Sequence, residues 1–295
     1  MRANPHLAGI GFGLLAYGIW GFFPLFFRQL AHVPPMDVLS NRAVWACVFV
    51  GLLLTLRGGW GKVATVFRAP RQLAMLALAA LLVGSNWLMF LWAVANQQVV
   101  ASSLGYFLTP LVNVALGLVV LKERLNRLEW IAVGLALAAI ANEVITLGSL
   151  PWVSLFLAAT FGTYGLVRKQ VPVDALSGLW LETLAMLPVC GIYALWMAQG
   201  GHTVFASHDP STAALLVGAG IITALPLMAF AAATQRLDLA TVGMLMYINP
   251  TMQFVTAVWI FGEPLQTARL LSFALIWLGL LFFSWSMWSK YRDRR

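Results

Sequence analysis

Long apolar runs dominate the chain, and short polar segments separate them. A bilayer core of about 30 Å needs about 20 mostly apolar residues in an α-helix. Windows of that kind follow one another along the sequence: 8–27, 39–56, 73–95, 100–121, 128–146, 150–167, 175–198, 213–235, 239–261 and 268–288. Helices formed by these runs would be apolar on every side, whereas the strands of a membrane barrel alternate apolar and polar residues. The pattern therefore predicts an all-α integral membrane protein with ten transmembrane helices.

Composition excludes the other broad classes. Hydrophobic residues make up 61% of the 295 residues and charged residues 9%, against about 25% charged in soluble domains. A disordered chain would lack this apolar content. The segments between the windows are too short for a soluble domain. Both cysteines, Cys47 and Cys190, fall inside windows, so a disulfide framework is not expected.

The placement of charge predicts the topology. The net charge is +8, which in a soluble domain would suggest nucleic acid. Fifteen of the 18 Lys and Arg residues lie in the tails and in the loops that ten spans place on the same side. This positive-inside bias predicts that both termini are cytoplasmic. Since the basic residues are divided among short segments, we expect contact with membrane lipid and no nucleic-acid partner.

The sequence contains a weak internal repeat. Under a shift of 140 residues three pairs of identical residues align: Arg28 with Arg168, Pro110 with Pro250, and Glu123 with Glu263. Five spans separate the paired positions, and because five is odd the second copy enters the membrane from the opposite side. We therefore expect two inverted five-helix repeats, 1–147 and 148–295, an arrangement common among secondary transporters.

Two charged residues lie well inside the windows, Arg42 and Glu182, and the same shift relates them. A charge at membrane depth costs about 2.5–3.5 kcal/mol on insertion scales, so it faces a cavity and has a partner or a task. The helical rise separates their depths by roughly 15 Å. We expect them to bracket a cavity and hold the two ends of a zwitterionic solute. A structural ion pair, or an Arg42 that snorkels to the surface, is the alternative.

Pro110 and Pro250 interrupt the fourth and ninth windows at matching positions. Each proline lacks an N–H and leaves the carbonyl four residues earlier unbonded, which kinks the helix. Such interruptions in both halves point to a gated transport site, while a simple bend in a packed helix is the alternative. Polar and aromatic side chains near the prolines are candidate binding residues: Tyr106, Thr109, Asn113, Tyr247, Asn249 and Gln253.

Aromatic residues within the windows are further candidates for a cavity that accepts a flat or amphipathic solute. We include Trp20, Trp87 and Trp180, together with Asn86 beside Trp87. Packing in the core is the alternative for these rings.

Signals for other chemistry are absent from the sequence. The segment 58–63 lacks the spacing and the Ser or Thr of a nucleotide-binding loop. The four histidines, His6, His32, His202 and His208, lie in tails or loops without ligand spacing. We therefore expect no metal, no cofactor and no enzymatic activity.

Five segments resemble the RarD branch of the EamA group in the drug/metabolite transporter superfamily. They are 86–94 (NWLMFLWAV), 103–107 (SLGYF), 121–125 (LKERL), 164–169 (YGLVRK) and 247–251 (YINPT). The resemblance extends from about residue 8 to residue 288. It implies ten helices in two inverted repeats with cytoplasmic tails. It also implies a bacterial inner membrane protein that moves amino acids, drugs such as chloramphenicol, or related metabolites, often outward.

These observations predict a secondary-active or facilitative permease. We expect it to export a small amphipathic or zwitterionic organic solute by alternating access. The alternative is an intramembrane enzyme or flippase that acts on a lipid-linked substrate, which would need a nucleophile or an acid–base pair at one depth.

Overall fold

The computed structural model describes residues 5–120, 126–148, 150–205, 209–234, 236–237, 245–265 and 267–292. Within these ranges the regular structure is helical, and no strand occurs. The helices are α1 (Pro5–Gly21), α2 (Phe23–Arg28), α3 (Pro35–Arg57), α4 (Trp60–Phe67), α5 (Pro70–Ala95), α6 (Val99–Val120), α7 (Arg127–Leu147), α8 (Trp152–Gln170), α9 (Ala175–Gln199), α10 (Pro210–Thr234), α12 (Ile248–Val255) and α13 (Thr267–Arg292), with a π-helical turn at Thr256–Ile260.

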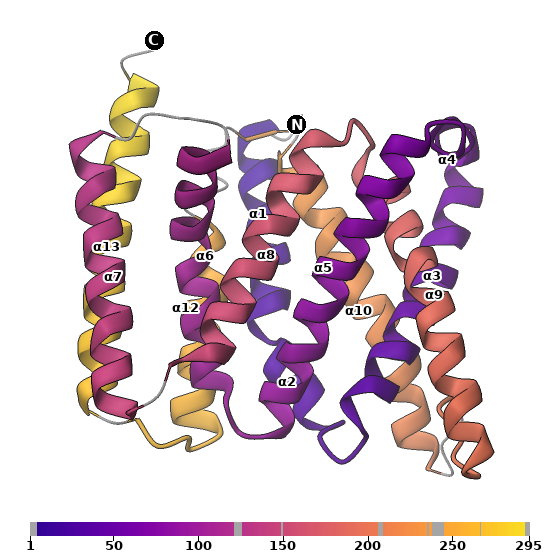
Figure 1. Cartoon of the computed structure of the whole chain (residues 1–295). Helices are drawn as coiled ribbons and strands as arrows, with labels where there is room; N and C mark the ends of the chain where they lie inside the picture. Colours follow the sequence, from indigo (N-terminus) through magenta and orange to yellow (C-terminus); the bar gives the residue numbers. More distant parts are fainter. Residues whose placement is uncertain are drawn as a thin grey trace.

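The long helices stand roughly parallel in a bundle, with α5 and α8 in front of α10 and α1 in the view of Figure 1. The first turn of α1 and the last turn of α13 lie at the same end, which we call the tail end, and the opposite end is the far end. Six helices are long and apolar enough to span a membrane within the described ranges: Leu7–Arg28, Pro35–Arg57, Pro70–Ala95, Arg127–Thr146, Ala175–Gln199 and Pro210–Phe230. The chain is thus an all-helical membrane protein. The other four expected spans stay predictions.

Local sequence explains several helix boundaries. Proline occupies the first position of α3, α5 and α10, where its missing N–H costs no hydrogen bond. Asn126 and Glu129 form a reciprocal capping box at the start of α7. The Asp174 carboxylate accepts the Ser177 N–H at 3.1 Å and caps α9. These side chains satisfy backbone donors that a helix start leaves unbonded.

The first predicted span contains a turn, and the segment after the second span contains a helix. The window 8–27 corresponds to the span Leu7–Arg28, in which a turn at Phe22 separates α1 from α2. Pro24 lies in the first turn of α2 and cannot donate to the carbonyl one turn earlier. The segment expected to be a loop after Arg57 contains α4, which buries Val63 and Val66 and exposes Lys62.

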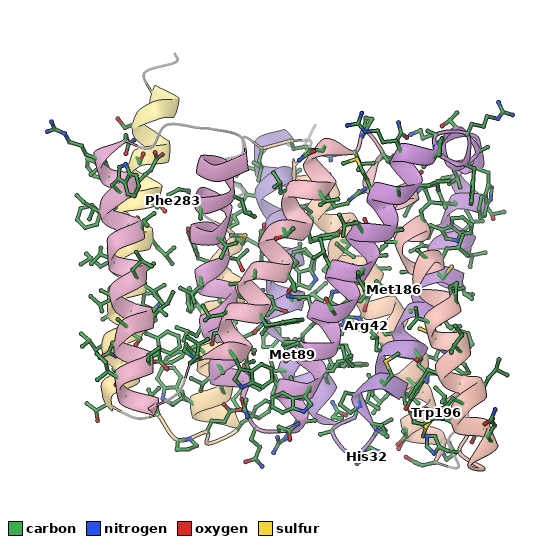
Figure 2. All side chains as sticks on the ribbon, viewed as in Figure 1. His32, Arg42, Met89, Met186, Trp196 and Phe283 are labelled. Carbon is green, nitrogen blue, oxygen red and sulfur yellow. The ribbon has the colours of Figure 1, made fainter. Side chains whose placement is uncertain are left out.

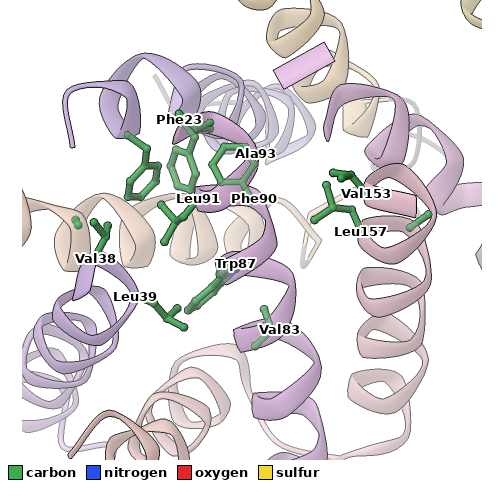
Figure 3. Packing of buried hydrophobic residues seen from close by; sticks show 14 of the residues in the cluster. Phe23, Val38, Leu39, Val83, Trp87, Phe90, Leu91, Ala93, Val153 and Leu157 are labelled. Atoms are coloured by element: carbon green, nitrogen blue, oxygen red, sulfur yellow. The ribbon is translucent and has the colours of Figure 1, made fainter. Parts of the chain in front are cut away.

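Apolar surface faces outward as well as inward. The core contains tightly packed residues such as Phe23, Val83, Leu91 and Leu157 (Figure 3). Large apolar side chains also cover the outside of the bundle (Figure 2), among them Leu81, Ile145 and Leu281. A continuous apolar exterior is expected where lipid tails replace water.

Gly220 allows α10 to approach α3 closely. A Cβ at this position would lie 2.5 Å from the backbone of Trp45 and Ala46. Gly220→Ala is therefore expected to force the two helices apart and destabilise the protein by about 1–3 kcal/mol. Thermal unfolding in detergent measures the effect. The matched control is Gly191→Ala, because a Cβ there meets nothing within 4 Å. Equal unfolding temperatures for the two variants would contradict close packing at Gly220.

Candidate functional site

Arg42 lies on α3, about half way along the bundle (Figure 2), and only 2% of it is exposed. Three aromatic rings surround its guanidinium group. The Cζ atom is 3.9 Å from the centre of the Trp87 ring, 5.2 Å from that of Phe27 and 5.5 Å from that of Phe23. We call these three rings the Arg42 cage. Cation–π attraction holds the guanidinium among them.

The polar edge of Arg42 is only partly bonded. Its Nε donates a hydrogen bond to Thr223 Oγ1 on α10 at 2.6 Å. Its Nη1 is buried and has no hydrogen-bond partner. Among the described residues no ion pair includes Arg42. The structure therefore holds a positive charge at mid-depth without a counter-ion of its own, and such a charge is costly unless it has a task.

Glu182 on α9 has a different basic partner. The Arg168 Nε lies 3.2 Å from Glu182 Oε1, and Tyr164 donates its O–H to Glu182 Oε2 at 3.2 Å. Tyr164 and Arg168 are four residues apart on α8 and thus lie on one face of that helix. We call Glu182, Arg168 and Tyr164 the Glu182 cluster. The sequence pointed to Arg168 only through the internal repeat and its loop charge, and the structure places it against the buried Glu182.

Gly178 leaves room for the guanidinium group of Arg168. It lies one helical turn before Glu182 on α9, and a Cβ there would lie 2.5 Å from both terminal nitrogens of Arg168. The guanidinium therefore rests directly on the α9 backbone. The expected separation between Arg42 and Glu182 fits this arrangement, since each residue has its own partners.

A series of aromatic rings connects the Arg42 cage with the Glu182 cluster. The ring centres of Phe27 and Phe90 are 6.1 Å apart, and those of Phe90 and Tyr106 are 6.2 Å apart. The next steps are 5.9 Å from Tyr106 to Phe161 and 5.8 Å from Phe161 to Tyr164. We call this series the aromatic ladder. Edge-on and tilted contacts of this length are favourable.

Asn86 fixes the middle of the aromatic ladder. Its Nδ2 donates to Thr160 Oγ1 at 2.9 Å and to the Leu157 carbonyl at 3.0 Å, both on α8. Its Oδ1 accepts the Tyr106 O–H at 3.1 Å. The Asn86 amide thus has partners on α6 and α8. Its observed role is to hold Tyr106 in place.

The residues around the two prolines behave differently in the two halves. The α6 helix continues through position 110, and Thr109 bonds the Gly105 carbonyl of its own helix at 3.3 Å. The side chains of Pro110 and Asn113 lie outside the described residues. In the second half a turn at Tyr247 precedes α12, so Pro250 lies in the first turn of α12.

Asn249 and Gln253 form a short polar pair beside this turn. Gln253 Nε2 donates to Asn249 Oδ1 at 2.8 Å. The Gln253 Oε1 is buried without a hydrogen-bond partner. The Pro250 carbonyl accepts the Ser103 hydroxyl at 2.8 Å, which ties α12 to α6.

Trp20 and Trp180 lie away from the cage. Trp20 on α1 packs against Tyr17 and Phe230, with ring centres 5.4 Å and 5.9 Å away. Trp180 packs edge-on against Trp60 of α4 at 4.9 Å. Trp87, in contrast, contacts Arg42 directly. The structure therefore brings only Trp87 of these three to the mid-depth charge.

A second polar cluster closes the far end. Asp37 at the start of α3 accepts the Tyr193 hydroxyl and pairs with His202 Nε2, both at 2.6 Å. Asn41 donates to the Val204 carbonyl at 2.8 Å. These contacts hold the segment after α9 against α3. Sequence analysis gave His202 no role, because its partner is distant in the chain.

Two clefts in the described part of the protein lie elsewhere. One of about 310 Å³ is lined by Glu143, Trp152, Ser154 and Phe273, among others. A second of about 240 Å³ lies at the tail end beside Lys62 and Asp174. Neither is lined by Arg42 or Glu182. Arg42 and Glu182 are themselves buried, so both charges are enclosed by side chains in this structure.

Comparison with known proteins adds independent evidence. The model of the EamA-like transporter family matches residues 7–142. The chain is 44% identical to an uncharacterized transporter of Pseudomonas aeruginosa, covering 96% of this chain and 95% of that protein. It is 40% identical to the protein RarD of Escherichia coli K12, covering 96% of each. It is 33% identical to the chloramphenicol-sensitive protein RarD of Pseudomonas aeruginosa, covering 94% and 93%.

One crystal structure resembles this chain with a TM-score of 0.60 at 19% sequence identity. The alignment covers 96% of this chain and 98% of the other, and it supports the fold alone. The sequence relatives carry more information, since they match nearly end to end. RarD-named proteins and transporters recur among them. The chain belongs to the EamA-like transporter family and, within it, to the RarD-type transporters.

Proposed function

We propose that the protein is an inner-membrane permease that exports a small amphipathic organic solute by alternating access. The observation that carries this proposal is the enclosed Arg42, whose Nη1 has no partner and which the aromatic ladder connects to the Glu182 cluster. A buried charge at one end of an aromatic surface suits an amphipathic molecule. One relative is named for chloramphenicol sensitivity, and chloramphenicol is amphipathic.

Helix positions support two inverted repeats, 1–147 and 148–295. Helices α3, α5 and α7 begin at residues 35, 70 and 127, and α9, α10 and α13 begin 140 residues later, at 175, 210 and 267. Each helix runs opposite to its counterpart in Figure 1: α3 rises from the far end to the tail end, and α9 descends. An inverted repeat requires this reversal.

Helix packing supports the same symmetry. Exchanging the halves converts the contact of α1 with α10 into that of α8 with α5, and both contacts occur. In the same way α3 on α10 corresponds to α9 on α5, and α1 on α12 to α8 on α6. The pairs α3 with α9, α6 with α12 and α7 with α13 map onto themselves. Two equivalent halves that rock against each other would expose one central site to each side in turn.

The proposed topology places the tail end in the cytoplasm. Lys62→Cys at the tail end and Phe205→Cys at the far end are both at exposed positions, while the natural Cys47 and Cys190 are buried. In intact cells an impermeant thiol reagent is expected to label position 205 and to leave position 62 unlabelled. Labelling of position 62 but not of position 205 would reverse the orientation.

We assign the gating movement to α6 around Pro110 and to the turn at Tyr247 beside Pro250. Replacing either proline by alanine restores a backbone donor, and is expected to straighten the helix and reduce solute flux while abundance stays the same. Flux and protein amount are measured in the same membranes. Pro188→Ala, a proline inside α9, is the matched control. Wild-type flux in both variants would show that these prolines serve helix packing and not gating.

The experiment that tests the permease proposal is uptake by purified protein in liposomes. Counterflow of labelled chloramphenicol and of labelled phenylalanine is compared with that in protein-free liposomes. We expect protein-dependent counterflow of at least one of them. No observation favours the intramembrane enzyme or flippase, and the named relatives are transporters.

A further inference from the structure

We propose that the solute is an organic monoanion whose carboxylate binds Arg42 and whose flat apolar group lies along the aromatic ladder. This inference rests on the proposed permease function and names the substrate class of its site. It also replaces the zwitterion expected from the sequence.

The balance of buried charge carries the first step. Glu182 is paired with Arg168, whose Nε lies 3.2 Å from Oε1, and its Oε2 accepts the Tyr164 O–H at 3.2 Å, while Oε1 accepts no hydrogen bond. Arg42 has no acidic partner among the described residues. A solute ammonium group on Glu182 would compete with Arg168 for the same carboxylate and would lie close to that guanidinium, where like charges repel. The free charge at the site is therefore a single positive one, and it selects an anion.

The geometry of the Arg42 cage carries the second step. The rings of Trp87, Phe27 and Phe23 contact the guanidinium. The 3.9 Å from Cζ to the centre of the Trp87 ring is the distance of a stacked contact, which leaves the N–H edge free. A carboxylate binds a guanidinium in the plane of the group, along its N–H edge. On that edge Nε bonds Thr223, and Nη1 is left as a buried donor without a partner. The cage thus holds the guanidinium among apolar rings, and one of its donors has no partner.

The two halves carry the third step. Arg28 and Arg42 occupy the positions that Arg168 and Glu182 occupy 140 residues later. In the second half the arginine meets its own carboxylate. In the first half Arg28 bonds the Val94 carbonyl at 3.3 Å and lies over the Phe261 ring at 5.3 Å, away from any such pair. A carboxylate supplied by the solute would complete in the first half the ion pair that the second half makes internally.

Access to Nη1 requires movement, because that atom is sealed in this arrangement. Opening the bundle towards one side would admit the carboxylate, and closing it would restore the enclosure. The aromatic ladder then offers ring faces and edges to the rest of the molecule.

The test uses four probes that share one ring and differ in charge: phenylacetate, phenylalanine, phenethylamine and phenylacetamide. Binding to the purified full-length protein is measured at neutral pH by ligand-dependent thermal stabilisation. Phenylacetate is expected to bind about tenfold or more tightly than the other three. Arg42→Gln is expected to remove this preference, and Arg42→Lys, which keeps the charge but not the planar edge, to reduce it. Arg28→Gln is the matched control and is expected to retain it.

Phenylalanine or phenethylamine binding as tightly as phenylacetate would overturn the proposal, and so would an anion preference that survives in a folded Arg42→Gln protein. Absence of binding by all four probes would also overturn it. Counterflow in liposomes separates this inference from the permease function. Flux of phenylalanine without flux of phenylacetate contradicts the anion and leaves the permease. Arg42-dependent binding of phenylacetate without flux of any probe supports the anion site and contradicts the permease.

Discussion

Arg42→Met is expected to abolish transport while leaving the stability of the protein within about 1 kcal/mol of wild type, or higher. Two effects oppose each other in the folded state. The methionine loses cation–π contacts worth about 2 kcal/mol and the hydrogen bond to Thr223. It also removes a buried cation that costs about 2.5–3.5 kcal/mol at membrane depth. Residues that serve binding commonly lower the stability of the folded protein in this way.

Thermal unfolding in detergent and counterflow in liposomes are measured on the same preparations of Arg42→Met. The control is Leu39→Met, a buried residue one turn earlier on α3, which is expected to change neither quantity appreciably. A strongly destabilised Arg42→Met protein would show that Arg42 stabilises the bundle, and the binding role would then lose its main support.

Glu182→Gln is expected to have the opposite effect on the fold. The glutamine leaves the Arg168 guanidinium against α9 without its carboxylate. Removing one partner of a buried ion pair destabilises by about 3–5 kcal/mol, and the partial exposure of Arg168 places the expected loss at the lower end. Arg168→Gln combined with Glu182→Gln should recover part of that loss, and a double-mutant cycle gives the coupling.

Gly178→Ala tests the same contact from the backbone side. The added Cβ displaces the Arg168 guanidinium from the α9 backbone. Gly178→Ala should therefore cost less stability in the Arg168→Gln background than in the wild type. The exchange Arg42→Glu with Glu182→Arg is a further control. Arg42 bonds Thr223, and Glu182 bonds Arg168 and Tyr164, so the two residues have separate partners. We therefore expect that the double exchange does not recover the folding and transport of the wild type. Restored folding and transport would mean that the two residues meet.

The apolar pattern predicted most of the helices well, because a lipid-facing helix must be apolar over its full length. The window 175–198 corresponds to α9 at Ala175–Gln199, and 128–146 to α7 at Arg127–Leu147. The break at Phe22 was missed because the apolar run continues through Pro24. The α4 helix was missed because a short amphipathic helix has the composition of a loop.

The candidate site was only partly predictable. The burial of Arg42 and Glu182 could be expected from their position in apolar runs, and both are buried. Their partners did not follow, since Thr223 is 181 residues from Arg42 in the chain. The Glu182 cluster had one usable signal, the spacing of Tyr164 and Arg168 on one helix face. The pairing of Asp37 with His202 had none, because it depends on how α3 and the segment after α9 meet in space.

Alternating access requires that the enclosed Arg42 cage opens to each side of the membrane in turn. Thr223→Cys, in a protein with Cys47→Ala and Cys190→Ala, places a thiol beside Arg42. The most direct measurement is its labelling by an impermeant thiol reagent in right-side-out and in inside-out vesicles. The account predicts labelling in both preparations and protection by phenylacetate in both. Labelling from neither side, or from one side alone, would contradict alternating access at this site.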